Sequence, residues 1–193
     1  MYLYRVLLGN AFSHLTEEQI KDIMFFPDIP HAIMKEENQD IERICLAESV
    51  EGCLTSIGWN RLDTTFQDFM DEEREALRVV ILKFDINNLD KKYLLSPEEL
   101  DEKGYVPDAY ITREWWYGLP AKPDEVEIRY LYDYDMSENE YVIPREVRMY
   151  MKEHNIVEGD KKFDEIIEKY MENGIEIPLI QRLVWLEDAE KAS

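Results

Sequence analysis

The sequence predicts an α+β protein with a mixed, largely antiparallel sheet and a C-terminal helical appendage. Strand and helix patterns are both present over residues 2–134, and the run at 77–86, LRVVILKFDI, is apolar enough for burial on both faces. After residue 136 helical patterns dominate. With 193 residues and 45% hydrophobic content, the chain can build a full core. We therefore expect an α+β domain over 1–136 and a helical appendage over 142–193.

The N-terminal part predicts two strands and three helices. The strands cover 2–8 and 43–47, and the helices cover 13–26, the segment from Ser49 to about Trp59, and 64–76. Thr16 and Gln19 have the spacing of a capping box, and Ser49 and Thr64 stand where helix caps are expected.

The central part predicts strands at 77–86, 109–117 and 125–134, with one short helix among them. That helix begins at Ser96-Pro97-Glu98-Glu99, which combines a cap, a first-turn proline and a capping-box acid, and it stops at Gly104. The proline-rich link between the last two strands does not suit a tight hairpin turn, so they could pair without being immediate neighbours. Trp115 and Trp116 alternate, which predicts that only one of them is core.

The C-terminal part predicts a polar linker at 137–140 and two helices, one opened by Pro144 and one over 160–173 with Asp160 as its cap. The segment 175–190 is ambiguous. Pro178 at a first turn favours a helix there, and a strand is the alternative.

The charge of the chain limits its partners. There are 43 acidic and 22 basic residues, and the net charge is −21. This argues against direct attraction to DNA, RNA or an anionic membrane. No apolar stretch is long enough to span a bilayer, and the N-terminus lacks a signal-peptide pattern. Cys45 and Cys53 are too few for a disulfide framework, so we expect a cytoplasmic protein with both thiols in the core.

General catalytic motifs give no assignment. The chain has no P-loop and no dinucleotide-binding glycine motif, and its three histidines are far apart, so no metal site is expected. Carboxylates are so abundant that an isolated acidic pair carries no information.

Three short motifs resemble the ADP-ribosyltransferase-like fold. They are Tyr4-Arg5-Val6 in the first strand, Ala47-Glu48-Ser49 entering a helix, and Thr112-Arg113-Glu114-Trp115-Trp116 late in the chain. The order over residues 2–134 is closest to the branch that includes DarT toxins, RES-domain toxins and RNA 2′-phosphotransferases. The resemblance implies an NAD-using protein of a phage or mobile element that acts on a host or competing component.

The resemblance also implies roles for six residues. Arg5 would bind a phosphate of NAD, Ser49 would orient the nicotinamide ribose, and Glu114 would stabilise the oxocarbenium-like transition state. The rings expected to stack on the nicotinamide or adenine are those of Tyr4, Tyr110 and Trp116. Thr112 stands where many protein-modifying members carry Glu or Gln, which puts arginine as the acceptor in doubt.

Each assignment has a structural alternative. Arg5 could pair with an acid, Ser49 could only cap a helix, and Glu114 could be an exposed strand residue. The whole protein could instead be a non-enzymatic acidic inhibitor, such as an anti-CRISPR or other anti-defence protein, that blocks the nucleic-acid-binding groove of a host protein. An RNA-directed enzyme is a third possibility and would need the mild basic cluster of Arg145, Arg148 and Lys152.

Overall fold

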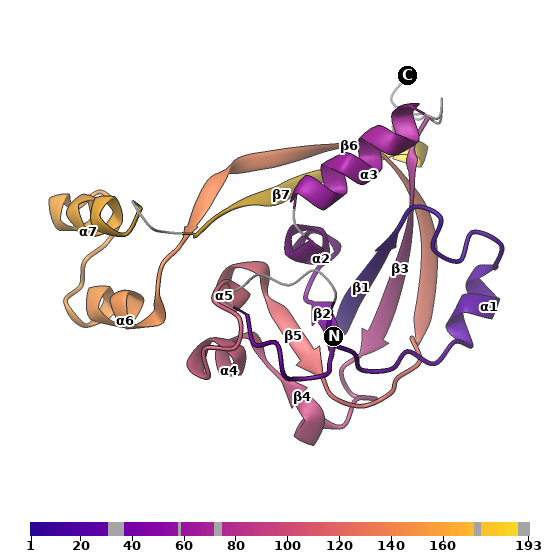
Figure 1. Ribbon diagram of the computed structural model, residues 1–193, viewed down its shortest axis with the longest axis horizontal. Helices are drawn as coiled ribbons and strands as arrows, with labels where there is room; N and C mark the ends of the chain where they lie inside the picture. Colours follow the sequence, from indigo (N-terminus) through magenta and orange to yellow (C-terminus); the bar gives the residue numbers. More distant parts are fainter. Residues whose placement is uncertain (31–36, 58, 72–74, 172–174, 189–193) are drawn as a thin grey trace.

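One seven-stranded antiparallel sheet organises the protein, with the strand order β4-β5-β2-β1-β3-β6-β7 (Figure 1). The computed structural model describes residues 1–30, 37–57, 59–71, 75–171 and 175–188. The strands are β1 (Tyr2–Leu8), β2 (Ile44–Ala47), β3 (Leu77–Asp85), β4 (Leu94–Leu95), β5 (Glu114–Tyr117), β6 (Glu125–Val142) and β7 (Ile175–Trp185). The predicted α+β class is confirmed, and every strand pair of the described sheet is antiparallel rather than mixed.

Helices lie on both sides of this sheet. They are α1 (Glu17–Lys21), α2 (Val50–Ile57), α3 (Trp59–Asp71), the 3-10 turn η1 (Lys91–Tyr93), α4 (Pro97–Glu102), α5 (Ala109–Thr112), α6 (Arg145–Glu153) and α7 (Lys161–Met171). Leu77, Val79 and Ile81 of β3 pack with α2 and α3, whereas Val80 and Leu82 belong to the core that includes α1. The prediction that β3 is buried on both faces is therefore confirmed.

Both predicted capping boxes are present. The backbone and side chain of Thr16 bond to Gln19, and Ser96 and Glu99 form the same reciprocal pair. The helix at α1 is nevertheless much shorter than the expected 13–26. Phe25 forms a backbone bridge with Ala121 instead, which takes the chain out of the helix.

The helix expected over 64–76 starts earlier. It begins at Trp59 and ends at Asp71, so Thr64 lies inside α3 and is not its cap. Leu62 is fully buried in the core that Phe66 also contacts. Burying both side chains requires helix on the N-terminal side of Thr64.

Only the second half of the segment 109–117, which was expected to be a strand throughout, forms a strand. Residues 109–112 form α5, Arg113 adopts a left-handed conformation with φ of 56°, and β5 begins at Glu114. The reason is that β2 offers only four residues, which pair with 114–117. Without a strand partner, the preceding segment forms a helical turn in which Thr112 Oγ1 donates to the Asp108 carbonyl at 3.2 Å. β5 does not pair with β6.

The polar linker expected at 137–140 is also not found. β6 continues through it to Val142, because β7 supplies a pairing partner from the far end of the chain. The ambiguous segment at 175–190 is thus a strand over Ile175–Trp185, and the helical alternative is wrong there. The pairing has register shifts between residues 131 and 139.

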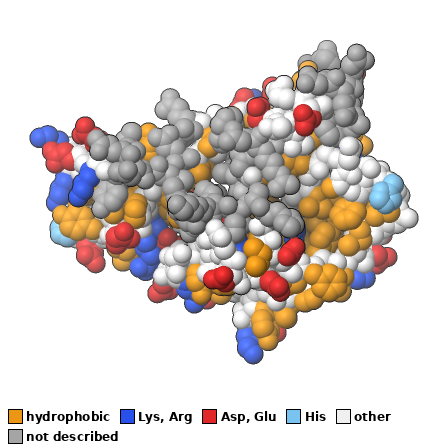
Figure 2. Space-filling view, viewed as in Figure 1, with side chains coloured by type: hydrophobic (Ala, Val, Ile, Leu, Met, Phe, Trp, Pro, Cys, Tyr) orange, Lys and Arg blue, Asp and Glu red, His pale blue; other side chains and the backbone are white. Residues whose placement is uncertain are grey.

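The paired strands β6 and β7 extend as an arm that carries the two predicted helices, α6 and α7, away from the rest of the sheet (Figure 1). These helices have a small core of their own, which contains Val147, Met151 and Ile156. Charged side chains of both signs are visible on this part of the surface, among hydrophobic ones (Figure 2).

Within the described part of the chain, no strand pairs with the outer side of β6 before Leu131, where its pairing with β7 begins. Helix α1 covers this margin. Glu17 Oε1 accepts a hydrogen bond of 2.8 Å from the backbone N–H of Ile128.

Candidate functional site

The sheet brings the three predicted motifs onto adjacent strands, β1, β2 and β5. Tyr4 opposes Ala47, and Ala47 opposes Glu114, so these three residues form one row across the sheet. Because neighbours along a strand point to opposite faces, Arg5 projects from the other face, with Leu46 and Trp115. Arg5 and Glu114 therefore lie on opposite faces of the sheet, and the described residues do not form the expected single pocket around both.

A groove of about 300 Å³ lies on the face of the sheet to which Tyr4 points. Its floor comes from β1, β3, β6 and β7, and its wall is the start of α2. The lining residues are Tyr4, Glu48, Ser49, Val50, Glu51, Ile81, Lys83, Glu127, Arg129, Leu183 and Trp185. Of the six predicted site residues, Tyr4 and Ser49 meet here.

Carboxylates already neutralise both cations of the groove. Lys83 Nζ lies 3.0 Å from Glu127 and 3.7 Å from Glu125, and the hydrogen bond to Glu127 raises the pKa of Lys83. The Arg129 guanidinium lies 4.2 Å from the centroid of the Trp185 ring and is 3.2 Å from Asp188. It also approaches Glu127 and Glu187, at 3.7 and 3.8 Å. The groove therefore has no spare positive charge for a phosphate.

Ser49 has the structural role that its sequence position suggested. Its Oγ accepts a hydrogen bond of 2.9 Å from the backbone N–H of Gly52, which caps α2. Gly52 itself packs tightly, since a Cβ there would be 2.6 Å from the carbonyl oxygen of Thr112. The start of α2 thus packs against Ala47, which lies between Tyr4 and Glu114 in the row across the sheet.

Glu114 and Trp116 belong to a buried polar cluster beneath α4 and α5. Glu114 is 5% exposed and accepts a 2.7 Å hydrogen bond from Trp116 Nε1. Burial, followed by repulsion from Glu37, raises the pKa of Glu114 to about 7. Asp108 is also buried, its Oδ1 has no hydrogen-bond partner among the described residues, and burial raises its pKa to about 6.

The guanidinium of Arg43 lies within this cluster. Arg43 is 2% exposed, pairs with Glu37 at 3.0 Å, and lies 3.8 Å from the centroid of the Trp116 ring. Tyr105 stacks on Trp116 at a centroid distance of 5.8 Å. The raised pKa values allow Glu114 and Asp108 to exchange protons near neutral pH. Glu114 and Trp116 are too deeply buried to contact a dinucleotide.

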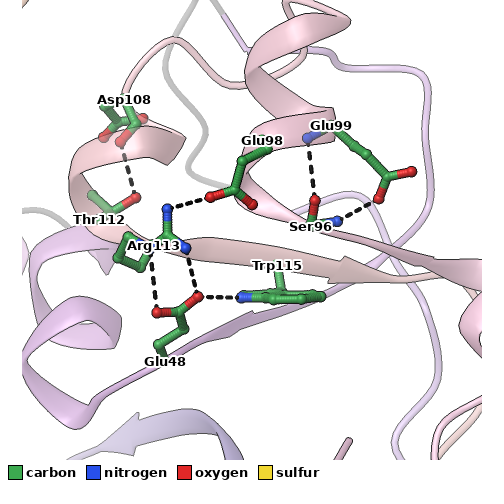
Figure 3. A network of polar contacts seen from close by, with 8 residues as sticks. All are labelled: Glu48, Ser96, Glu98, Glu99, Asp108, Thr112, Arg113 and Trp115. Atoms are coloured by element: carbon green, nitrogen blue, oxygen red, sulfur yellow. Dashed lines mark hydrogen bonds and ion pairs between the residues drawn. The ribbon is translucent and has the colours of Figure 1, made fainter.

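Arg113 fixes the junction between α5 and β5 (Figure 3). It holds both carboxylate oxygens of Glu48, at 2.9 and 3.2 Å, and Glu98 at 2.7 Å. Trp115 Nε1 donates to Glu48 at 3.1 Å. These bonds raise the pKa of Arg113 and tie the end of β2 to α4. Trp115 is partly buried and Trp116 fully buried, as their alternation predicts.

Arg5 is half-buried on the opposite face. Its guanidinium carbon lies 5.8 Å from the centroid of the Phe25 ring, and burial lowers its pKa. Every other arginine whose side chain is described forms an ion pair or donates a hydrogen bond. Arg5 has neither among the described residues, although the charge of Asp28 acts on it, so the alternative of a direct ion pair with an acid is not found.

Tyr110 does not line the groove and instead belongs to a set of polar contacts between the arm and the main body. The Arg148 guanidinium stacks on the Tyr110 ring, with its central carbon 3.6 Å from the ring centroid. The Tyr110 hydroxyl accepts a hydrogen bond of 2.9 Å from the backbone N–H of Ile143. Asp101 of α4 binds Arg148 and lies 3.7 Å from Arg145. Two members of the predicted basic cluster are therefore engaged within the protein.

Sequence reasoning missed most of the groove. The strand alternation of 125–134 had placed Glu127 and Arg129 on one face, but their neighbours Lys83 and Trp185 come from distant strands.

No group of three or more potential ligands in the described chain is arranged to hold a metal ion. Among the described helices, none has the length and apolar character needed to cross a bilayer.

Comparisons with protein-family models, curated proteins and solved structures gave no match to the chain.

Proposed function

We propose that the protein is a non-enzymatic acidic binding protein that occupies a cationic, nucleic-acid-binding surface of a protein partner. The observation that carries this proposal is the charge arrangement of the groove. Glu125, Glu127, Glu187 and Asp188 surround its two cations, and Glu48 and Glu51 add further negative charge at its wall.

The rest of the molecule supports the same interpretation. The chain has 21 more acidic than basic residues, and its described ion pairs consume most of the arginines that could attract an anion. A surface with this excess attracts a positively charged partner and repels nucleic acid. Basic grooves that bind DNA or RNA respond to charge first, which makes them suitable targets.

The test is competition. The protein is added to complexes between a short DNA duplex and each of several DNA-binding proteins, without NAD. We expect release of DNA from at least one, and a steep loss of this inhibition between about 50 and 200 mM salt. Inhibition that persists unchanged in salt, or that requires NAD, contradicts the proposal.

A second candidate is the NAD-dependent ADP-ribosyltransferase-like enzyme, and one observation favours it. Arg5 forms no ion pair or hydrogen bond with any described residue, and it lies on the central strand β1, next to β2, which leads into the second motif. A half-buried guanidinium of this kind suits a phosphate. Glu114 would then have to act from the other face of the sheet, which weighs against this candidate.

Calorimetry with NAD separates the two candidates. The binding protein should produce no heat. Saturable heat that Arg5→Ala abolishes and Arg182→Ala preserves would support the enzyme, because Arg182 is an exposed arginine on β7 with a weak pair at 3.8 Å.

A further inference from the structure

Glu51 differs from the other acids of the groove. Glu48 is held by Arg113, and Glu127 is held by Lys83 and Arg129. Glu51 lines the groove from the first turn of α2 and has no ion pair or hydrogen bond among the described residues. Its carboxylate is therefore available to a positive group from outside.

The surroundings of Glu51 suit a basic side chain better than a simple cation. Tyr4 contributes aromatic surface, and Ile81, Val50 and Leu183 contribute aliphatic surface, whereas the Trp185 ring already contacts Arg129. Lysine and arginine have an apolar stem and a charged end, so they can contact both kinds of surface at once. An isolated metal ion would gain nothing from the apolar part.

We propose that this groove is the docking site for a lysine or arginine side chain of the protein partner, with Glu51 as its carboxylate and Tyr4 as its aromatic wall. This inference rests on the proposed binding function and names the point of contact. A volume of about 300 Å³ accommodates one such side chain with part of its backbone. The net charge of −21 adds a long-range attraction that brings the partner to the groove.

Glu146 supplies a matched control. Glu51 is the second residue of α2 and Glu146 is the second residue of α6, so both stand near the positive end of a helix dipole. Glu146 is exposed on the arm, away from the groove. Glu51→Lys and Glu146→Lys change the net charge equally, so they weaken the long-range attraction equally.

The experiment titrates a peptide of alternating arginine and glycine into the full chain at low salt. We expect Glu51→Lys to weaken binding by at least about tenfold and Glu146→Lys by less than about threefold. Glu51→Gln, which keeps the side-chain shape, should fall between them. In an NMR titration, the backbone N–H of Gly52 and the indole N–H of Trp185 should shift.

Two results would overturn the inference, and they have different consequences for the proposed binding function. If the wild type binds the peptide but both lysine variants weaken it equally, the groove is not the contact point and the binding function stands. If the wild type gives no heat with the peptide and also fails in the DNA competition, the binding function fails as well.

Discussion

Glu114 accepts a hydrogen bond from the indole nitrogen of Trp116, two residues further along the same strand, and both side chains are sealed beneath α4 and α5. The carboxyl group thus lies in a site that disfavours its charge, next to Glu37 and Asp108, which repel it further. This arrangement makes the stability of the protein depend on pH.

We predict that Glu114→Gln flattens this pH dependence. The pKa of Glu114 rises from about 4.5 in the unfolded chain to about 7 in the folded protein. The folded protein therefore holds the proton more tightly, so its stability is greatest below pH 4.5 and falls as the pH rises through 7. At about 1.4 kcal/mol per pKa unit, the loss is on the order of 3 kcal/mol.

Urea unfolding followed by tryptophan fluorescence, at pH 5 and pH 8, measures this effect. The glutamine variant should exceed the wild type in stability at pH 8 and differ little from it at pH 5. Glu102→Gln, an exposed substitution on α4, controls for the general effect of removing one negative charge. An equal gain for Glu102→Gln would show that Glu114 ionises without penalty.

Ser49 is expected to matter for stability through its cap on α2. Ser49→Ala removes the acceptor for the Gly52 N–H and should cost about 1 kcal/mol. Ser49→Asp keeps an acceptor at the same place and should retain most of the stability. Thermal unfolding of the three proteins distinguishes a cap from a residue whose hydroxyl is needed only for a ligand, since in the latter case both variants would melt like the wild type.

Gly52→Ala should destabilise the protein because the added Cβ meets backbone. The Thr112 carbonyl oxygen would be 2.6 Å away, so α2 and the end of α5 must move apart. We expect a net loss of about 1–2 kcal/mol even though alanine favours a helix. At Gly118 the nearest atom would be 3.7 Å away, so Gly118→Ala should leave the urea midpoint almost unchanged. Similar losses in both variants would contradict the close contact.

Asp101 holds the arm against the main body through Arg145 and Arg148. Asp101→Asn should weaken this latch by about 1 kcal/mol, because the ion pairs are only partly buried. Hydrogen exchange should become faster in α6, whose small core is separate from that of the sheet, and should stay unchanged in β3. Glu102→Gln on the same helix is the control. Unchanged exchange in α6 would mean that other contacts hold the arm.

Local signals predicted the fold best. The capping boxes at Thr16 and Ser96 and the buried strand β3 were predictable because their determinants lie within a few residues. The path of β6 was not, since its polar stretch reads as a linker until β7, more than 30 residues later, is known to pair with it. The left-handed Arg113 likewise depends on where β2 ends.

In the candidate site too, some features follow from the local sequence and others depend on distant segments. The register could not be foreseen, but the opposite directions of Tyr4 and Arg5 follow from the two-residue period of a strand and were available from the sequence. The burial of Glu114 depends on α4 and α5 packing over it, and the groove depends on side chains from four strands and one helix. Contacts between residues this far apart in the chain cannot be predicted from the pattern of a single sequence.

The carboxylate of Glu17 against the free margin of β6 has a consequence for self-association. An incoming chain that tried to extend the sheet at this point would have to displace a negative group from the Ile128 peptide before offering its own carbonyl. With every molecule carrying the same large charge, two copies also repel each other as they approach. The protein is thereby protected from sheet extension by a second copy along the part of β6 that β7 does not pair with.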